Sequence, residues 1–122
     1  MAKTFAVSIV DDDESVREGL VSLMRSHGYV ATSFDSAESF LRSGSGPADC
    51  LIADMHMPGM SGIELFNRLA ASGNPIPTIL ITARHEEGVR AQAIRAGVLC
   101  YLPKPFKEDE LLGCIRALVK GR

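Results

Sequence analysis

Five short apolar runs, each followed by a segment of helical periodicity, constrain the fold of this 122-residue chain more than any other feature. The runs cover residues 5–10, 29–34, 50–54, 77–82 and 99–102. Most are nearly continuous in hydrophobicity, which is typical of parallel strands buried on both faces. Strands that alternate with helices favour right-handed crossovers. The sequence therefore predicts one α/β domain over residues 1–122, a (βα)5 doubly wound parallel five-stranded sheet in three layers.

Capping residues mark the ends of the predicted helices. Gly28 stands where the first helix should end, and Gly97 closes a weakly amphipathic helix that begins at about Glu87. Ser61 and Glu64 have capping-box spacing, so another helix should begin there. The last helix has a clear apolar stripe, made of Leu111, Leu112, Ile115, Leu118 and Val119.

Charge and hydropathy argue against two classes of function. The net charge is −2 and the basic residues are scattered, so we expect no direct contact with nucleic acid. No apolar run approaches the roughly 20 residues of a membrane span. The polar start Met-Ala-Lys-Thr is not that of a signal peptide. We therefore expect a cytoplasmic chain that does not contact the membrane.

The three cysteines, Cys50, Cys100 and Cys114, are widely spaced and set in apolar surroundings. Their odd number and their spacing are typical of reduced, buried cysteines in a cytosolic protein. A disulfide framework or a zinc site is not expected. We therefore predict three reduced thiols.

Polar side chains follow four of the predicted strands, at the point where each strand ends. Asp11 and Asp12 follow the first strand, Asp54 ends the third, Thr82 ends the fourth, and Lys104 follows the fifth. In a parallel sheet the carboxyl ends of the strands meet at one edge, where ligands bind. We therefore expect these carboxylates, the hydroxyl and the ammonium group to converge on one rim.

Each of these residues also has a simpler structural interpretation. Asp13 and Glu14 are best explained as acidic residues that complement the dipole of the following helix. Thr82 alone could bond its hydroxyl to the backbone, and Lys104 alone could be a solvated loop residue. The joint placement of the set at the ends of four different strands favours a functional site.

Clustered carboxylates need a cation. Asp11 and Asp12 would repel each other and Asp54, and hard oxygen ligands without a Cys or His pattern suit Mg²⁺. The acidic Asp-Asp-Asp-Glu-Ser loop would repel a directly bound phosphate, which argues against a flavin-type cofactor site. A metal beside a lysine and a hydroxyl is suited to phosphoryl transfer. The predicted nucleophile is Asp54, which would form an acyl phosphate.

Four segments resemble the receiver domain of bacterial two-component response regulators: SIVDDDESVR, CLIADMHMPGMSGIEL, ILITA and YLPKPF. The spacing agrees as well, because Thr82 lies 28 residues after Asp54 and Lys104 lies 22 residues after Thr82. The resemblance covers essentially all 122 residues and is to the FixJ-type subgroup, whose receivers precede a helix-turn-helix output domain. It implies the flavodoxin-like strand order 2-1-3-4-5.

The resemblance also implies the roles of the acidic residues. Asp54 would accept a phosphoryl group from a phosphohistidine of a sensor histidine kinase. Asp11, Asp12 and Asp54 would hold Mg²⁺ together with the backbone carbonyl of His56.

The remaining implied roles concern the switch. Thr82 would donate its hydroxyl to the phosphoryl group, Lys104 would pair with that group, and the Lys104–Pro105 peptide would be cis. Tyr101 would turn inward as Thr82 moves, although a strand tyrosine with its hydroxyl at the surface is the simpler alternative. The helix 4–strand 5–helix 5 surface would then control an output partner or domain in transcription. A homodimer on phosphorylation is compatible with this role.

Two residues flank the implied phosphoryl site, His56 and Arg84, and we expect them to modulate the lifetime of the phosphorylated state. His27 and His85 are interpreted as ordinary surface or helix-end residues, and no metal role is expected for His56 with His85.

A different class of protein, the aspartyl-phosphate hydrolases of the haloacid-dehalogenase kind, uses a similar Asp, Thr and Lys set. Those enzymes need a second aspartate two residues after the nucleophile, where this chain has His56. The chain is also too short to carry a substrate-covering cap. A non-enzymatic signalling switch is therefore the favoured interpretation, and the hydrolase is the alternative.

Overall fold

All five predicted strands are present in the structure, a computed structural model that describes residues 4–43, 48–84 and 86–121. The strands are β1 (Ala6–Val10), β2 (Val30–Phe34), β3 (Cys50–Asp54), β4 (Thr78–Thr82) and β5 (Cys100–Pro103). The helices are α1 (Glu14–Ser26), α2 (Ala37–Arg42), α3 (Gly62–Ala71), α4 (Glu87–Ala96) and α5 (Glu108–Lys120). Within the described ranges, no helix is long and apolar enough to cross a membrane.

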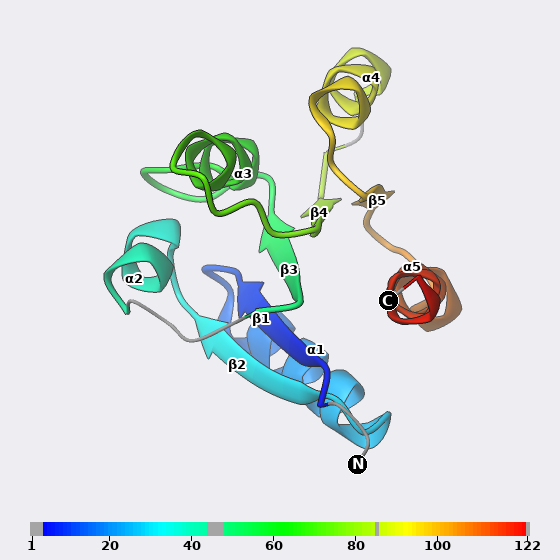
Figure 1. The fold of residues 1–122 in the computed structure, drawn as a ribbon. Coiled ribbons are helices and arrows are strands. Elements are labelled where there is room, and N and C mark those ends of the chain that lie inside the picture. Colours follow the sequence, from blue (N-terminus) through cyan, green and yellow to red (C-terminus); the bar gives the residue numbers. More distant parts are fainter. Residues whose placement is uncertain (1–3, 44–47, 85, 122) are drawn as a thin grey trace.

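The strands form one parallel sheet in the order β2-β1-β3-β4-β5, which confirms the expected strand order (Figure 1). Helices α1 and α5 cover one face of the sheet, and α2, α3 and α4 cover the other (Figure 1). The strand order reverses at the centre, where β1 and β3 lie side by side. The carboxyl ends of these two strands are therefore where a ligand of such a sheet is expected to bind.

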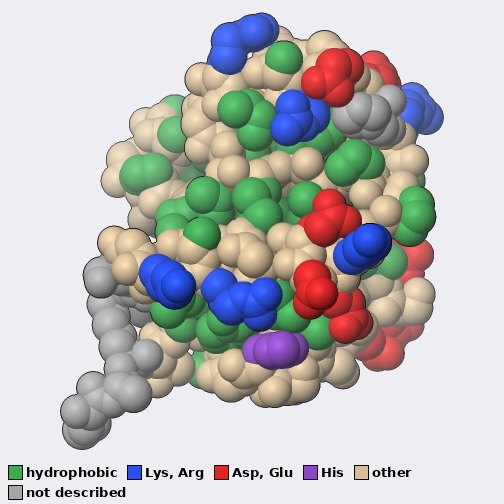
Figure 2. All heavy atoms as spheres, turned by 90° about the vertical axis from the view of Figure 1, so that its right-hand side faces the viewer, with side chains coloured by type: hydrophobic (Ala, Val, Ile, Leu, Met, Phe, Trp, Pro, Cys, Tyr) green, Lys and Arg blue, Asp and Glu red, His purple; other side chains and the backbone are tan. Residues whose placement is uncertain are grey.

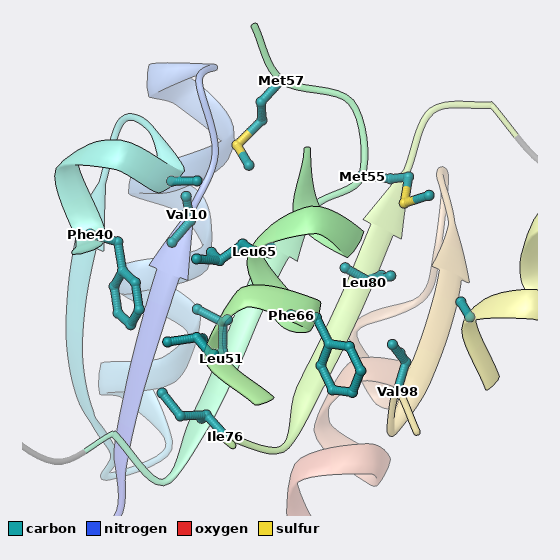
Figure 3. Packing of buried hydrophobic residues seen from close by; sticks show 14 of the residues in the cluster. Val10, Phe40, Leu51, Met55, Met57, Leu65, Phe66, Ile76, Leu80 and Val98 are labelled. Carbon is teal, nitrogen blue, oxygen red and sulfur yellow. The ribbon is translucent and has the colours of Figure 1, made fainter. Parts of the chain in front are cut away.

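Buried apolar side chains form one cluster on each face of the sheet. Phe40, Leu65 and Phe66 belong to the cluster beneath α2, α3 and α4 (Figure 3). Leu111 and Ile115 of α5 belong to the cluster on the opposite face. Every residue of β3 and β4 is buried, which accounts for the continuous hydrophobicity of these two runs. Packing on both faces holds the polar strand ends in place.

Side-chain capping interactions begin helices α1 and α3. The Asp13 carboxylate accepts hydrogen bonds from the backbone N–H groups of Ser15 and Val16, so this residue is the N-cap of α1 rather than part of the acidic cluster. Ser61 and Glu64 form the expected capping box at the start of α3.

Glycines with positive φ end two helices where the sequence predicted. Gly97 is the C-cap of α4, with φ of 110°. Gly28, with φ of 85°, follows the exposed C-cap residue His27 of α1. The prediction that His27 is a surface residue at a helix end is confirmed. The polar start (residues 1–3), part of the loop before β3 (residues 44–47) and His85 lie outside the described residues.

The prediction of three reduced cysteines is wrong for two of them. Cys100 in β5 and Cys114 in α5 form a disulfide, with Cα atoms 6.8 Å apart. Cys50 is a buried free thiol, as expected, and burial raises its pKa to about 12. The pairing could not be foreseen from spacing alone, because it depends on how α5 folds back over the edge strand. Such tertiary packing brings the two residues together across a separation of 14 positions.

Candidate functional site

The register of the sheet places Asp11 beside Asp54. Val10, the last residue of β1, pairs with Ala53 of β3, so the next residue of each strand emerges at the same edge. Thr82 pairs with Pro103 across β4 and β5, which brings Lys104 to this edge as well. The predicted convergence of the polar strand ends on one rim is therefore observed.

Three carboxylates form a cluster at the rim. Asp11, Asp12 and Asp54 each present an oxygen, and these oxygens all lie within 4.8 Å of one another. Asp11 is fully buried and Asp54 is 7% exposed, whereas Asp12 is exposed to solvent. Such close carboxylates, two of them buried, repel each other unless a cation lies between them.

One buried carboxylate oxygen of the cluster accepts no hydrogen bond from the described residues. Asp54 Oδ1 accepts a bond of 3.3 Å from the His56 backbone N–H, and Asp11 Oδ1 accepts one of 2.9 Å from Asp13. Asp11 Oδ2 is buried and has no hydrogen-bond partner among the described residues. The Lys104 Nζ lies 3.9 Å from this oxygen. A buried carboxylate oxygen that accepts no hydrogen bond from the described residues and lies beside two other carboxylates fits a hard divalent cation such as Mg²⁺.

The pKa shifts of the two buried carboxyl groups also favour a bound cation. Burial raises the pKa of Asp11 above its usual value, and the nearby Asp54 charge raises it further. Burial is likewise the main cause of the raised pKa of Asp54, while the His56 N–H and the Lys104 ammonium oppose the shift. Both groups therefore resist ionisation in the absence of a cation, and a bound cation would favour their charged forms.

Thr82 and Lys104 flank the acidic cluster. Thr82 is fully buried, and its hydroxyl donates to the Arg84 carbonyl at 2.9 Å and accepts from the Arg84 N–H at 3.1 Å. The simpler expectation of a hydroxyl bonded to backbone thus describes this state. The Lys104 backbone N–H donates to the Thr82 carbonyl, and the Lys104–Pro105 peptide is cis, as expected. The solvated-loop alternative for Lys104 does not fit, because its ammonium group points toward Asp11.

The residues expected to transmit or modulate a signal lie around this core. Tyr101 is only 5% exposed, and its hydroxyl oxygen is buried, so the alternative of a hydroxyl at the surface is wrong for this structure. His56 and Arg84 are both exposed, two residues beyond Asp54 and Thr82. His85 lies outside the described residues, so its expected surface role stays a prediction.

Sequence reasoning missed Gly62, the first residue of α3. A Cβ atom at this position would lie 2.5 Å from the Asp54 carbonyl oxygen and 2.9 Å from Leu80 Cδ2. The Gly62 N–H donates to the Met55 carbonyl at 3.2 Å. Only a residue without a side chain lets α3 approach the end of β3 so closely. The available signal was a glycine directly after the Ser61 N-cap, where most residues favour a helix more.

Comparison with known proteins decides the family. Residues 7–116 match the response regulator receiver domain family. The chain belongs to this family. As a receiver domain it acts in two-component signalling, and it falls among receivers rather than among the haloacid dehalogenases that were the alternative.

Curated relatives of the receiver domain are response regulators, and one of them is named a transcriptional regulatory protein. It is 43% identical over 115 residues to response regulator protein TmoT of Ectopseudomonas mendocina, covering 93% of this chain and 52% of that protein. It is 33% identical over 115 residues to transcriptional regulatory protein FixJ of Bradyrhizobium diazoefficiens, covering 93% of this chain and 56% of that protein. The chain thus spans about half the length of the curated relatives it matches.

Solved structures agree with this placement. The receiver domain superposes on response regulator StyR with a TM-score of 0.86 and 43% identity, covering 97% of this chain and 60% of that one. It superposes on FixJ-N with a TM-score of 0.86 and 30% identity, covering 99% and 98% of the two chains. The FixJ-type receiver fold predicted from the sequence is confirmed.

Proposed function

We propose that Asp54 is the phospho-acceptor of this receiver and that its donor is the phosphohistidine of a sensor histidine kinase. The observation that carries the proposal is the meeting of Asp11, Asp12 and Asp54 at one rim, with Asp11 Oδ2 buried and without a hydrogen-bond partner among the described residues. A carboxylate oxygen of Asp54 would form a bond to phosphorus as the phosphorus–nitrogen bond breaks and the imidazole leaves. Residues 1–122 would act as one cytoplasmic receiver unit without contacting nucleic acid or membrane.

The remaining site residues have complementary roles in this proposal. Asp11, Asp12, Asp54 and the backbone carbonyl of His56 would hold Mg²⁺, which neutralises charge on the transferring phosphoryl oxygens. Lys104 would turn from Asp11 to pair with the phosphoryl group. We expect no repeated release of phosphate from small phosphoesters, because the site has no second carboxylate two residues beyond Asp54 to act as general acid.

The output of the switch would be a changed surface on α4, β5 and α5. Thr82 would release the Arg84 backbone and move toward the phosphoryl group, and Tyr101 of β5 would repack in response. This face is turned toward the viewer in Figure 2, where hydrophobic side chains lie among charged ones. Its exposed apolar residues, Ile94, Leu99 and Val119, would suit an output partner or domain acting in transcription, or a second copy of the chain.

Beryllofluoride, a phosphoryl mimic, tests this output surface. Titration in the presence of Mg²⁺ should shift the NMR peaks of residues 85–106, because a switch needs a two-state element that the phosphoryl group biases. An Asp54→Asn variant is the control and should show no such shifts. Shifts confined to residues 11–15 and 54–60 would contradict the proposed surface.

The lifetime of the phosphorylated state should depend on Arg84 and His56. Both side chains are exposed at the rim, where they can obstruct a water approaching in line with the bond between Asp54 and phosphorus. Arg84→Ala and His56→Ala should each shorten the lifetime by a factor of up to about ten, or ~1.4 kcal/mol of barrier. A dephosphorylation time course at fixed Mg²⁺ measures this, with the exposed Arg116→Ala of α5 as control. Unchanged lifetimes in both variants would leave Thr82 and Lys104 to set the rate.

A further inference from the structure

The Cys100–Cys114 disulfide joins the edge strand β5 to helix α5, inside the surface proposed to respond to phosphorylation. Cys100 begins β5, and Cys114 lies in the middle of α5. The segment that the bond closes contains both Tyr101 and Lys104. A covalent bond at this position therefore ties the strand that leads to the phosphoryl site directly to an output helix.

The two paired cysteines differ from Cys50 in accessibility. Both are partly exposed and lie at the margin of the hydrophobic cluster between the sheet and α5. Cys50 is fully buried, and its thiol has a pKa raised to about 12. Thiol–disulfide exchange requires access and a thiolate, so it can reach the pair but not Cys50. The chain thus contains its own unreactive control cysteine.

The geometry of the bond limits how far strand and helix can separate. The Cα atoms of Cys100 and Cys114 are 6.8 Å apart, and a disulfide cannot bridge Cα atoms separated by more than about 7 Å. Neighbouring side chains of a strand point to opposite faces, so Cys100 faces α5 while Tyr101 packs in the cluster on the α4 side. With the bond formed, β5 cannot move away from α5 when Tyr101 repacks.

We propose that Cys100 and Cys114 form a redox switch within this receiver. When oxidised, the pair ties β5 to α5 and restrains the response of the α4–β5–α5 surface; when reduced, it releases that surface. The effect of the disulfide on the α4–β5–α5 surface rests on the proposed function, whereas the formation of the disulfide does not. Regulatory disulfides of this kind are typically transient in reducing compartments.

A low-molecular-weight disulfide supplies the oxidising equivalents. The thiolate of one cysteine attacks this reagent, forming a mixed disulfide and releasing one thiol. The second cysteine then attacks the mixed disulfide, forming the protein bond and releasing the second thiol. The protein loses two electrons and two protons, and the reagent gains them as it is reduced to two thiols.

Alkylation and thermal melting test the bond. The protein is equilibrated with oxidised or reduced glutathione and alkylated under denaturing conditions, and its mass is then measured by mass spectrometry. We expect one alkylated cysteine after oxidation and three after reduction, with a melting temperature higher by on the order of 10 °C in the oxidised form. Cys50→Ser should keep this difference, and Cys114→Ser should abolish it. Three alkylated cysteines in the wild type after oxidation, or equal melting temperatures, would overturn the proposal.

A beryllofluoride titration of both redox forms tests the restraint. Shifts at residues 11–15 and 54–60 report occupancy of the site and should be the same in both forms. Shifts over α4 and α5 should be at least about twofold smaller in the oxidised protein, and Cys114→Ser should behave as the reduced form. Equal shifts in both forms would refute the restraint. If neither the reduced protein nor Cys114→Ser showed shifts over α4 and α5, the proposed output surface would be contradicted instead. Alkylation and melting would still show whether the disulfide forms.

Discussion

An Asp54→Asn variant should take up no phosphoryl group from acetyl phosphate, a loss of roughly 100-fold or more in rate. The amide has nearly the shape of the carboxylate and can still accept the bond from His56, so the fold should be preserved. It lacks the anionic oxygen that attacks phosphorus. Intact-protein mass spectrometry after incubation with acetyl phosphate and Mg²⁺ measures the uptake.

Asp35→Asn provides a matched control, because Asp35 is an exposed carboxylate that directly follows β2 at the same edge of the sheet. It should be phosphorylated at the wild-type rate. Adding EDTA should abolish uptake by the wild type, since the carboxylate cluster depends on a divalent cation. If Asp54→Asn took up phosphate normally, or if EDTA had no effect, the assignment of the site would be wrong.

Replacing Asp11 by Asn should have opposite effects on stability and on metal binding. Burial raises the pKa of Asp11, so the charged carboxylate destabilises the metal-free fold at neutral pH. That cost is fully present above the raised pKa and fades as the pH falls toward the usual value of 3.8. The variant should therefore melt at a higher temperature than metal-free wild type at pH 7, and the difference should shrink on acidification.

The same variant should lose its response to Mg²⁺. A ligand that binds only the folded state raises the melting temperature as its occupancy rises, and an amide in place of the buried Asp11 carboxylate removes one anionic ligand. Calorimetric melting with increasing Mg²⁺ measures both effects. Asp12→Asn, at an exposed position of the same cluster, should weaken the Mg²⁺ response without the gain in metal-free stability. A wild-type Mg²⁺ response in Asp11→Asn would remove this residue from the metal site.

The sequence was sufficient for those parts of the site that follow from strand topology. Asp54 and Asp11 could be placed together because a parallel sheet brings the carboxyl ends of its strands to one edge. The capping box of Ser61 and Glu64 and the turn at Gly97 could also be predicted, because each depends on a few neighbouring residues.

Features that depend on how separate elements pack could not be predicted in the same way. Cys100 and Cys114 meet only because α5 folds over β5, which no spacing rule encodes. The state of the Thr82 hydroxyl, which bonds to the Arg84 backbone here, depends on the conformation of the following loop. The need for glycine at position 62 depends on how closely the start of α3 approaches the Asp54 carbonyl, which is a tertiary contact.

The close approach at Gly62 makes the surroundings of Asp54 unequally stiff. Helix α3 rests on the Asp54 carbonyl with no side chain between them, and the capping box fixes the start of the helix. When a phosphoryl group is added, α3 cannot shift toward β3 to accommodate it, because the two are already in close contact. The Thr82 hydroxyl, by contrast, is bonded to the backbone of Arg84, two residues further on, and can exchange this partner at little cost. We therefore expect phosphorylation of Asp54 to displace residues of β4 and β5 rather than α3, because the side of Asp54 next to α3 is rigid.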